Sequence, residues 1–397
     1  FGYVQKGVPM RYLAVPITLT AIAILPACSA TDLEPLKSNA SGFLQSTVMS
    51  TAPSQAQTAR QPKATPPRIA SAPTAQPCAS ETTQALLTPF SQDPTPVRLN
   101  CRVKLPPNST ITRQVLFEGS AASGAALDCS GGTASGTALK GDKEAILVRS
   151  VETPNGWDRP VGITVRNCNI TGAVRMYGLG RTGEGAKVKA SSMNANHTAF
   201  AQSVAPSNIT FDRVEITASS TTPFYVSPGV TGATLSNSTL KGTSASAAVY
   251  LDAESAGARI VGNTFSIKSG EREQVAIDGS AYNEISGNRF LNVKTGGIYA
   301  YRNCGEGGTI RHQSPQFNTI TNNTFEMSGL LNAPAVWLNS RNGNRSYCFQ
   351  DPSHPFGSST SPLDFAQNNT VEGNRSPGAT IDPYRNNDPS NRVSGNN

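Results

Sequence analysis

The sequence predicts an all-β solenoid whose coils are about 25 residues long. The composition is low in charged (15%) and aromatic (7%) residues and rich in Gly, Ser, Thr and Asn, which suits a β protein with many turns. A short pattern of apolar and polar positions also recurs along the chain, with copies that start at residues 211, 235, 260 and 285. These starts lie 24–25 residues apart, and a fixed period in this range is typical of stacked repeats.

The repeated pattern begins with an apolar residue, passes through polar positions that are often Asn, and ends on an apolar residue. Its copies are VRNCNI at 165–170, LSNSTL at 235–240, IVGNTF at 260–265, ISGNRF at 285–290, ITNNTF at 320–325 and VEGN at 371–374, with a weaker copy, FDRVEI, at 211–216. One coil cannot bury its inner face alone, so the coils must stack and share a core. We expect the polar residues before each final apolar residue to form an Asn-rich ladder at one corner.

A second strand lies between the copies of this pattern. Its members are residues 174–177, 224–227, 249–252, 275–278, 298–301 and 336–339. Side chains alternate between the two faces of a strand, so the second and fourth residues should point outward. Stacked in register, they form one row at Arg175, Tyr225, Tyr250, Ala276, Tyr299 and Trp337, and another at Tyr177, Ser227, Asp252, Asp278, Tyr301 and Asn339.

This arrangement of strands resembles the right-handed parallel β-helix proteins of the pectate-lyase-like superfamily over about residues 95–380. The resemblance implies a right-handed parallel β-helix. It says little about activity, because that fold carries lyases, hydrolases, epimerases, esterases and adhesins.

The N-terminal region indicates export. Residues 1–9 look like sequence upstream of the true start, and Met10 and Arg11 precede an apolar run that is too short to span a bilayer comfortably. The run ends in LPAC at 25–28, which resembles a bacterial lipobox with Cys28 as the lipidated residue. In that family Ser29 at the next position implies the outer membrane, with the domain on the periplasmic or cell-surface side. The alternative is an ordinary secretory signal peptide with a chance cysteine.

The mature chain is expected to have two parts. Residues 29–77 are rich in Ser, Ala, Thr, Pro and Gln and predict a disordered tether, while residues 78–397 form the β-helix domain. Three long loops, at 178–208, 303–317 and 341–368, follow the second strand and are expected to wall a groove over it. Six cysteines remain after Cys28, which in an oxidising compartment predicts disulfides. Cys304 and Cys348 lie in two of the loops and could join them, although the sequence alone allows fifteen pairings.

Carboxylates on the outward rows suggest where the chemistry could lie. Asp252 and Asp278 should stack about 4.8 Å apart, with Glu254 beside them. Like charges this close need a cation or a raised pKa, so these three residues could bind Ca²⁺. The ion would neutralise a uronate carboxylate while a base removes the adjacent proton, as the resemblance to pectate lyases implies. The candidate bases are Tyr301, Arg302, His312 and Arg341.

Alternatives to this lyase remain open. Asp252 and Asp278 could act as the paired carboxylates of a glycoside hydrolase, although the hallmark motifs of polygalacturonases are absent. The chain could also be a non-catalytic envelope protein that binds glycans, or the two Asp residues could only cap turns. The residues expected to bind sugar through rings and polar groups are Tyr177, Tyr225, Tyr250, Glu254, Tyr299, Trp337 and Asn339.

The formal charge of +7 favours an anionic polysaccharide as the partner. No run of five or more Lys and Arg residues is present, so we expect no nucleic-acid binding. We expect a monomer that contacts the membrane only through its lipid anchor.

Overall fold

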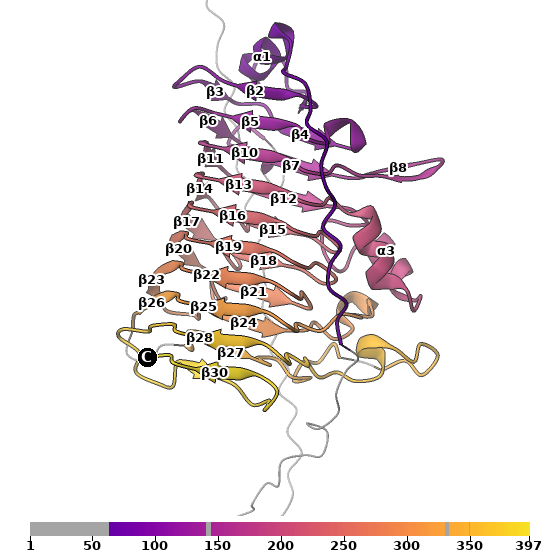
Figure 1. Cartoon of the computed structure of the whole chain (residues 1–397), viewed down its shortest axis with the longest axis vertical. Helices are drawn as coiled ribbons and strands as arrows, with labels where there is room; N and C mark the ends of the chain where they lie inside the picture. The colour runs from indigo at the N-terminus through magenta and orange to yellow at the C-terminus, as the bar shows by residue number, and fades with distance from the viewer. Residues whose placement is uncertain (1–62, 140–143, 330–332, 349) are drawn as a thin grey trace, which may run out of the picture. The chain divides into compact units, whose positions relative to one another are not determined.

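The computed structural model describes residues 63–139, 144–329, 333–348 and 350–397. Across these residues the chain winds into a right-handed parallel β-helix, which confirms the predicted fold class (Figure 1). Most coils place one short strand in each of three parallel sheets. The structure therefore has the repeat that the sequence spacing predicts.

The three parallel sheets run the length of the β-helix. The first sheet contains β1 (Val97–Arg98), β4 (Val115–Glu118), β7 (Glu144–Arg149), β12 (Ala173–Tyr177), β15 (Phe224–Val226), β18 (Val249–Leu251), β21 (Val275–Asp278), β24 (Ile298–Tyr301), β27 (Val336–Leu338) and β29 (Tyr384–Arg385). The second contains β2 (Arg102–Lys104), β5 (Ala126–Asp128), β10 (Thr164–Arg166), β13 (Thr210–Asp212), β16 (Thr234–Ser236), β19 (Arg259–Val261), β22 (Glu284–Ser286), β25 (Thr319–Thr321), β28 (Thr370–Glu372) and β30 (Arg392–Ser394). The third contains β3 (Thr110–Ile111), β6 (Thr133–Ser135), β11 (Asn169–Thr171), β14 (Glu215–Ala218), β17 (Thr239–Ser244), β20 (Thr264–Ser269), β23 (Arg289–Val293) and β26 (Thr324–Met327).

The register of the second sheet follows the repeat. Phe211 pairs with Leu235, Leu235 with Ile260, and Ile260 with Ile285. These residues are fully buried, and they continue into a single apolar column along the inside of the helix. Phe290 stacks between Phe265 and Phe325, with ring centroids 4.3 and 4.7 Å apart. The core is therefore made of like residues stacked coil upon coil.

The Asn ladder forms as predicted. Asn263, Asn288, Asn323 and Asn374 are buried, and each side-chain amide donates to the Asn of the next coil at 2.9–3.0 Å. A second ladder, which the sequence reasoning missed, contains Asn283, Asn318, Asn369 and Asn391. Both ladders satisfy buried backbone groups where the chain turns.

Short helices and one hairpin lie outside the β-helix, at its N-terminal end and along one side. The short helix α1 (Ser80–Leu87) lies at the N-terminal end of the stack, where Leu86 is fully buried (Figure 1). A hairpin of β8 (Val151–Thr153) and β9 (Gly156–Asp158) projects from the body, and α2 (Ala186–Ser192) and α3 (His197–Val204) lie beside the first sheet.

The six cysteines of the described residues form three disulfides. They pair as Cys78–Cys101, Cys129–Cys168 and Cys304–Cys348. The prediction of disulfides is confirmed, and so is the link between the loops that follow β24 and β27.

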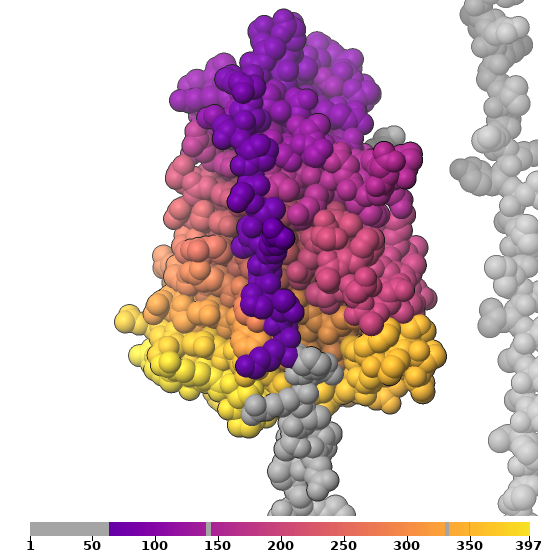
Figure 2. Space-filling model, turned by 45° about the vertical axis from the view of Figure 1, so that its right-hand side comes forward, coloured from indigo at the N-terminus to yellow at the C-terminus, as the bar shows by residue number. Residues whose placement is uncertain are grey.

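Residues 63–77 lie along the β-helix instead of forming a free tether. Figures 1 and 2 show this indigo segment running over many coils. The Ala70 N–H donates to Ser207 Oγ at 3.2 Å, and Tyr282 Oη donates to the Ala64 carbonyl at 2.6 Å. The prediction of disorder is therefore wrong for this part of the segment, because its small and proline residues fit against glycines of the corner, such as Gly162 and Gly257.

The predicted signal peptide, the lipobox with Cys28 and the first part of the tether lie outside the described residues. In the part of the chain that the structure describes, no helix has the length and apolar character needed to cross a membrane.

Candidate functional site

The outward row of the first sheet has the predicted register. Arg175 pairs with Tyr225, Tyr225 with Tyr250, Tyr250 with Ala276, Ala276 with Tyr299, and Tyr299 with Trp337, on consecutive strands. In the next row Asp278 pairs with Tyr301. The rings of Tyr225 and Tyr250 stack 4.9 Å apart, and the Arg175 guanidinium lies 4.1 Å from the Tyr225 ring centroid. The row of outward side chains therefore exists as predicted.

The long loops cover the middle of this face. They fold onto the sheet, whereas the sequence predicted that they would only form the walls of a groove over it. Asp252 and Asp278 have exposed fractions of 1% and 0%. Asp252 Oδ2 accepts hydrogen bonds from the Gly183 N–H and Tyr225 Oη, at 2.9 and 2.8 Å. The expectation that Asp252 is an exposed catalytic acid is therefore wrong, because its carboxylate holds the 178–208 loop on the sheet.

Asp278 has the same role for the following loop. Its Oδ1 accepts the Asn303 N–H at 2.8 Å, and its Oδ2 accepts Asn303 Nδ2 at 2.7 Å and Tyr250 Oη at 2.9 Å. Tyr225 and Tyr250 are each only 9% exposed and bond these carboxylates, so they are not an open sugar-binding floor. Both aspartates anchor loops.

Burial changes the proton affinity of Asp252. The pKa of Asp252 is raised to about 7, mainly because burial removes hydration; the Arg311 guanidinium opposes this shift, and the neighbouring Asp278 adds to it. The Arg311 guanidinium, itself 0% exposed, also donates to Glu184 at 2.7 Å. This buried network joins the sheet to two loops.

Glu254 and His312 belong to a separate group of hydrogen bonds that holds the loops together. The Glu254 carboxylate accepts the backbone N–H groups of His312 and Gln313, and also the Thr198 hydroxyl. His312 Nε2 lies 2.8 Å from the Ser192 carbonyl oxygen, and its ring lies 5.1 Å from that of His197. Glu254 is fully buried, so the prediction that it binds sugar is wrong, whereas His312 is half-buried and its role as a base stays a prediction.

The proposed Ca²⁺ ligands do not fit a cation. The oxygens of Asp252, Glu254 and Asp278 already accept hydrogen bonds from loop N–H and O–H groups. Within the ranges that the structure describes, no three His, Cys, Asp or Glu side chains are grouped to hold a metal ion.

Two other predicted site residues are structural. Arg302 is fully buried, and its guanidinium donates to the carbonyls of Ser361 and Leu363, at 2.9 and 2.7 Å. It is enclosed by the 341–368 loop, and so it cannot act as a base on the outer face. Asn339 is 6% exposed and exchanges hydrogen bonds with the backbone of Ala366.

An open cavity of about 260 Å³ remains on this face at β24 and β27, and we call it the arginine cavity. It is lined by Glu271, Arg272, Glu273, Thr295, Tyr299, Tyr301, Trp337, Ser340, Arg341 and Arg345. Four of these were predicted site residues, namely Tyr299, Tyr301, Trp337 and Arg341. The sequence reasoning missed Arg272, Glu273 and Arg345. The sequence could have pointed to Arg272 and Glu273, because these adjacent charged residues directly precede β21. The turn before a strand of the first sheet opens onto this face.

Tyr301 and Glu273 line the arginine cavity with little exposed surface, at 1% and 4%. The Tyr301 Oη donates to Glu273 Oε1 at 2.8 Å and accepts from Arg272 Nη2 at 2.6 Å. Burial and the Glu273 carboxylate raise the pKa of the Tyr301 phenol well above its usual range, although Arg341 and Arg272 oppose this shift. The pKa of Glu273 is lowered: burial raises it, but the hydrogen bond and charge of Arg272 outweigh that effect. A protonated phenol is thus paired with an ionised carboxylate.

Arg341 is held over Tyr301 by a chain of contacts that begins at Asp278. Its guanidinium carbon lies 3.8 Å from the Tyr301 ring centroid. Its Nη1 donates to Asn303 Oδ1 and to Tyr347 Oη, and Asn303 in turn donates to Asp278. The Cys304–Cys348 disulfide joins the residues next to Asn303 and Tyr347. The position of the arginine therefore depends on both loops.

Tyr177 lies apart from this group. It lines another cavity, of about 320 Å³, with Arg149, Trp157 and Lys187. Arg149 Nη1 donates to Tyr177 Oη at 3.3 Å. The structure therefore does not bring Tyr177 together with Tyr301.

Comparison with known proteins identifies the fold. Residues 155–350 match a family model described as a right handed beta helix region. No curated protein matches the chain.

Among solved structures, an alginate lyase from Paenibacillus sp. strain FPU-7 matches with 11% identity and a TM-score of 0.41, over 78% of this chain and 97% of that one. The mannuronan C-5 epimerase AlgE4 A-module of Azotobacter vinelandii matches with 11% identity and a TM-score of 0.27, over 82% and 94%. A PL6 alginate lyase in complex with a trisaccharide matches with 14% identity and a TM-score of 0.23, over 76% and 70%. At these identities and TM-scores, the likenesses carry no information about the activity of this chain.

Proposed function

We propose that this right-handed parallel β-helix protein cleaves an acidic polysaccharide by β-elimination in the arginine cavity. The observation that carries the proposal is the Tyr301 phenol, which lies between the Glu273 carboxylate and the guanidinium groups of Arg272 and Arg341. This grouping supplies an acid, a base and fixed positive charge within one open cavity.

The cationic residues suit a substrate with carboxylate groups. Arg341 and Arg345 line the cavity and can pair with a uronate carboxylate, which makes the neighbouring C–H bond more acidic. Tyr299 and Trp337 lie on consecutive strands with ring centroids 5.5 Å apart, and both are half-buried. Such rings offer apolar surface to sugar faces while their polar edges stay wet.

The elimination balances with these groups. The Glu273 carboxylate takes the proton next to the uronate carboxylate, and the electrons of that C–H bond form the new C=C bond. The bond to the glycosidic oxygen breaks, and Tyr301 gives that oxygen its phenolic proton, leaving a phenolate beside Arg272. The proton on Glu273 then returns to Tyr301 along their 2.8 Å hydrogen bond, which restores both groups.

Two alternatives predict different results. A hydrolase that uses Asp252 and Asp278 would need both carboxylates to line a cavity that the substrate can enter, whereas the arginine cavity is lined by Glu273 and Tyr301 and by neither aspartate. A glycan-binding protein without activity would keep the binding and lack the turnover.

The test uses purified protein and a panel of uronate-containing and neutral polysaccharides. We expect ultraviolet absorbance from an unsaturated product with an acidic substrate. Tyr301→Phe and Glu273→Gln should each lower kcat by about 10²-fold or more, since each removes a group that transfers a proton. Tyr282→Phe is the matched control, because its hydroxyl bonds the Ala64 carbonyl on another corner of the helix. New reducing ends without that absorbance, or full activity of both variants, would overturn the proposal.

We also propose that the protein is exported and lipidated at Cys28. Three disulfides among the described residues support an oxidising compartment. Metabolic labelling with a radioactive fatty acid should mark the wild-type protein and not Cys28→Ser. Equal labelling of both would contradict this assignment.

A further inference from the structure

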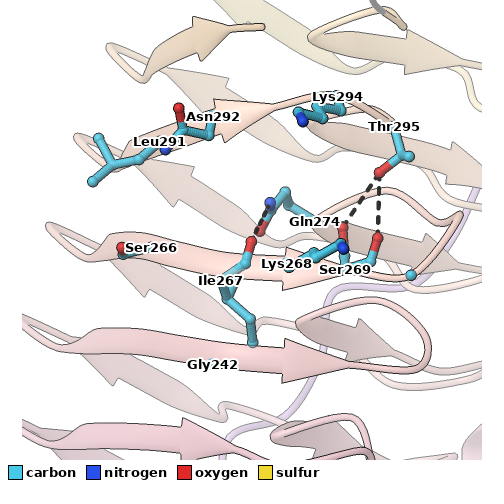
Figure 3. A pocket seen from close by; sticks show the side chains of 11 residues that line it. Gly242, Ser266, Ile267, Lys268, Ser269, Gln274, Leu291, Asn292, Lys294 and Thr295 are labelled. Atoms are coloured by element: carbon cyan, nitrogen blue, oxygen red, sulfur yellow. Dashed lines mark hydrogen bonds between the residues drawn. The ribbon is translucent and has the colours of Figure 1, made fainter. Parts of the chain in front are cut away.

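A second cavity lies on the third sheet, and we call it the bulge cavity. It has a volume of about 340 Å³ and is lined by Gly242, Ser266, Ile267, Lys268, Ser269, Gly270, Gln274, Leu291, Asn292, Lys294 and Thr295 (Figure 3). This volume falls within the range of small-ligand sites. The residues come from β17, β20, β23 and the turns that follow them.

The cavity results from an interruption in the sheet. On one side, β20 pairs with β17 over all six residues, from Thr264 to Ser269. On the other side, it pairs with β23 only at Thr264 and Phe265. In the pairing of β23 with the next strand, β26, the register shifts between Phe290 and Val293, and Asn292 adopts a φ of 54°. This bulge separates the two strands beyond Phe265 and leaves the hollow between them.

The lining is positively charged and has an unused acceptor. Lys268 and Lys294 are exposed, and no carboxylate of the described residues pairs with either. Gln274 is 3% exposed, and its Nε2 donates to the Ile267 carbonyl at 2.9 Å. Its Oε1 is buried and accepts no hydrogen bond from the residues that the structure describes. Two cations and a free amide oxygen match a ligand with both an anionic group and a hydroxyl donor.

The bulge cavity is next to the arginine cavity. Thr295 lines both, and the turn between β20 and β21 separates them. Ser269 Oγ and Thr295 Oγ1 both donate to the Arg272 carbonyl, at 2.8 and 2.6 Å, which fixes this turn. One face of the turn presents Arg272 and Glu273, and the other presents Gln274. A chain molecule bound in one cavity therefore has a short path over the turn into the other.

We infer that the bulge cavity is a second subsite, which binds an acidic sugar unit of the polysaccharide outside the arginine cavity. The inference rests on the proposed function only for the identity of the polymer. Lys268 and Lys294 hold the carboxylate, and Gln274 Oε1 accepts from a sugar hydroxyl. The protein then prefers long acidic chains, because one chain occupies both cavities.

Binding is measured first, without any need for turnover. Galacturonate is titrated into protein with ¹³C-labelled Ile and Leu methyl groups, and the Ile267 and Leu291 signals report on the bulge cavity. We expect saturable shifts in the wild-type protein and in Tyr301→Phe, and about fivefold to tenfold weaker binding in Lys268→Gln/Lys294→Gln. Arg102→Gln/Lys104→Gln removes the same charge from the second sheet and should bind as the wild type does. Absence of shifts, equal binding in the lysine variant, or equal shifts with galactose would overturn the inference.

Kinetics then test the link between the two cavities. With a substrate from the panel above, Lys268→Gln/Lys294→Gln should raise KM about fivefold to tenfold for long chains and leave kcat and the KM of the shortest cleaved oligosaccharide unchanged. An unchanged KM for long chains would show that the bulge cavity is no part of the substrate path. If no glycan of the panel is cleaved, the proposed function fails while the methyl titration still decides whether the subsite exists.

Discussion

Replacing Asp278 by Asn separates the two roles that this residue could have. If Asp278 were a catalytic acid, the substitution would abolish turnover and leave the stability of the fold unchanged. As a loop anchor it contributes three accepted hydrogen bonds, from the Asn303 N–H, Asn303 Nδ2 and Tyr250 Oη. The structure therefore predicts that Asp278→Asn destabilises the loop before it affects any chemistry.

The magnitude follows from what an amide can do at this position. Asn has one accepting oxygen, and its NH₂ group costs least where it faces the Asn303 backbone N–H, because that orientation leaves one donor without an acceptor, whereas the opposite orientation leaves both the Asn303 amide and the Tyr250 hydroxyl without one. A buried donor left without a partner costs about 1–3 kcal/mol, and each of the remaining bonds loses about 1 kcal/mol as its acceptor becomes neutral. We expect the free energy of unfolding to fall by about 3–5 kcal/mol.

Urea denaturation at pH 7 measures this change, with Asp382→Asn as the control because Asp382 is exposed. Hydrogen exchange over residues 303–317 should also accelerate in Asp278→Asn, since its loop contacts weaken. KM for an acidic glycan should rise, because Asn303 positions Arg341. Stability within 0.5 kcal/mol of the wild type, together with loss of kcat, would refute the anchor role and restore a catalytic one.

Other perturbations test separate parts of the structure. Asn288→Ala removes a buried side chain that forms hydrogen bonds with Asn263, Ile260 and Asn323. Thermal or urea unfolding should show that the free energy of unfolding falls by about 3–5 kcal/mol. A decrease below about 1 kcal/mol would mean that the ladder adds little stability. Trp337→Ala should weaken oligosaccharide binding about tenfold in calorimetry with little change in kcat, and unchanged binding would remove this ring from the site. The pKa of Asp252 is raised to about 7, so the folded protein keeps a proton that the unfolded chain loses near pH 4. The stability of the wild type relative to Asp252→Asn should therefore fall between about pH 4 and pH 7, by at most about 1.4 kcal/mol per pH unit, and a flat difference would contradict the buried carboxylate.

Much of the fold could be read from the sequence because a β-helix is periodic. Each coil contacts its neighbours through like positions, so a spacing of 24–25 residues fixes which side chains stack. The pairing of Phe211, Leu235, Ile260 and Ile285 follows directly from the repeat. Period-two alternation likewise predicted the outward row from Arg175 to Trp337.

The tertiary structure alone decided which parts of that row stay open. Asp252 and Asp278 hold the outward register that the sequence assigns them, yet they are buried because Gly183 and Asn303 bring loops down onto them. Loops without a repeat have no periodic signal, and their contacts depend on residues distant in the chain. The same holds for Glu273 and Tyr301, which are 28 residues apart and meet only because one coil lies on the next. Local patterns set the direction of a side chain, whereas exposure and partners depend on what folds over it.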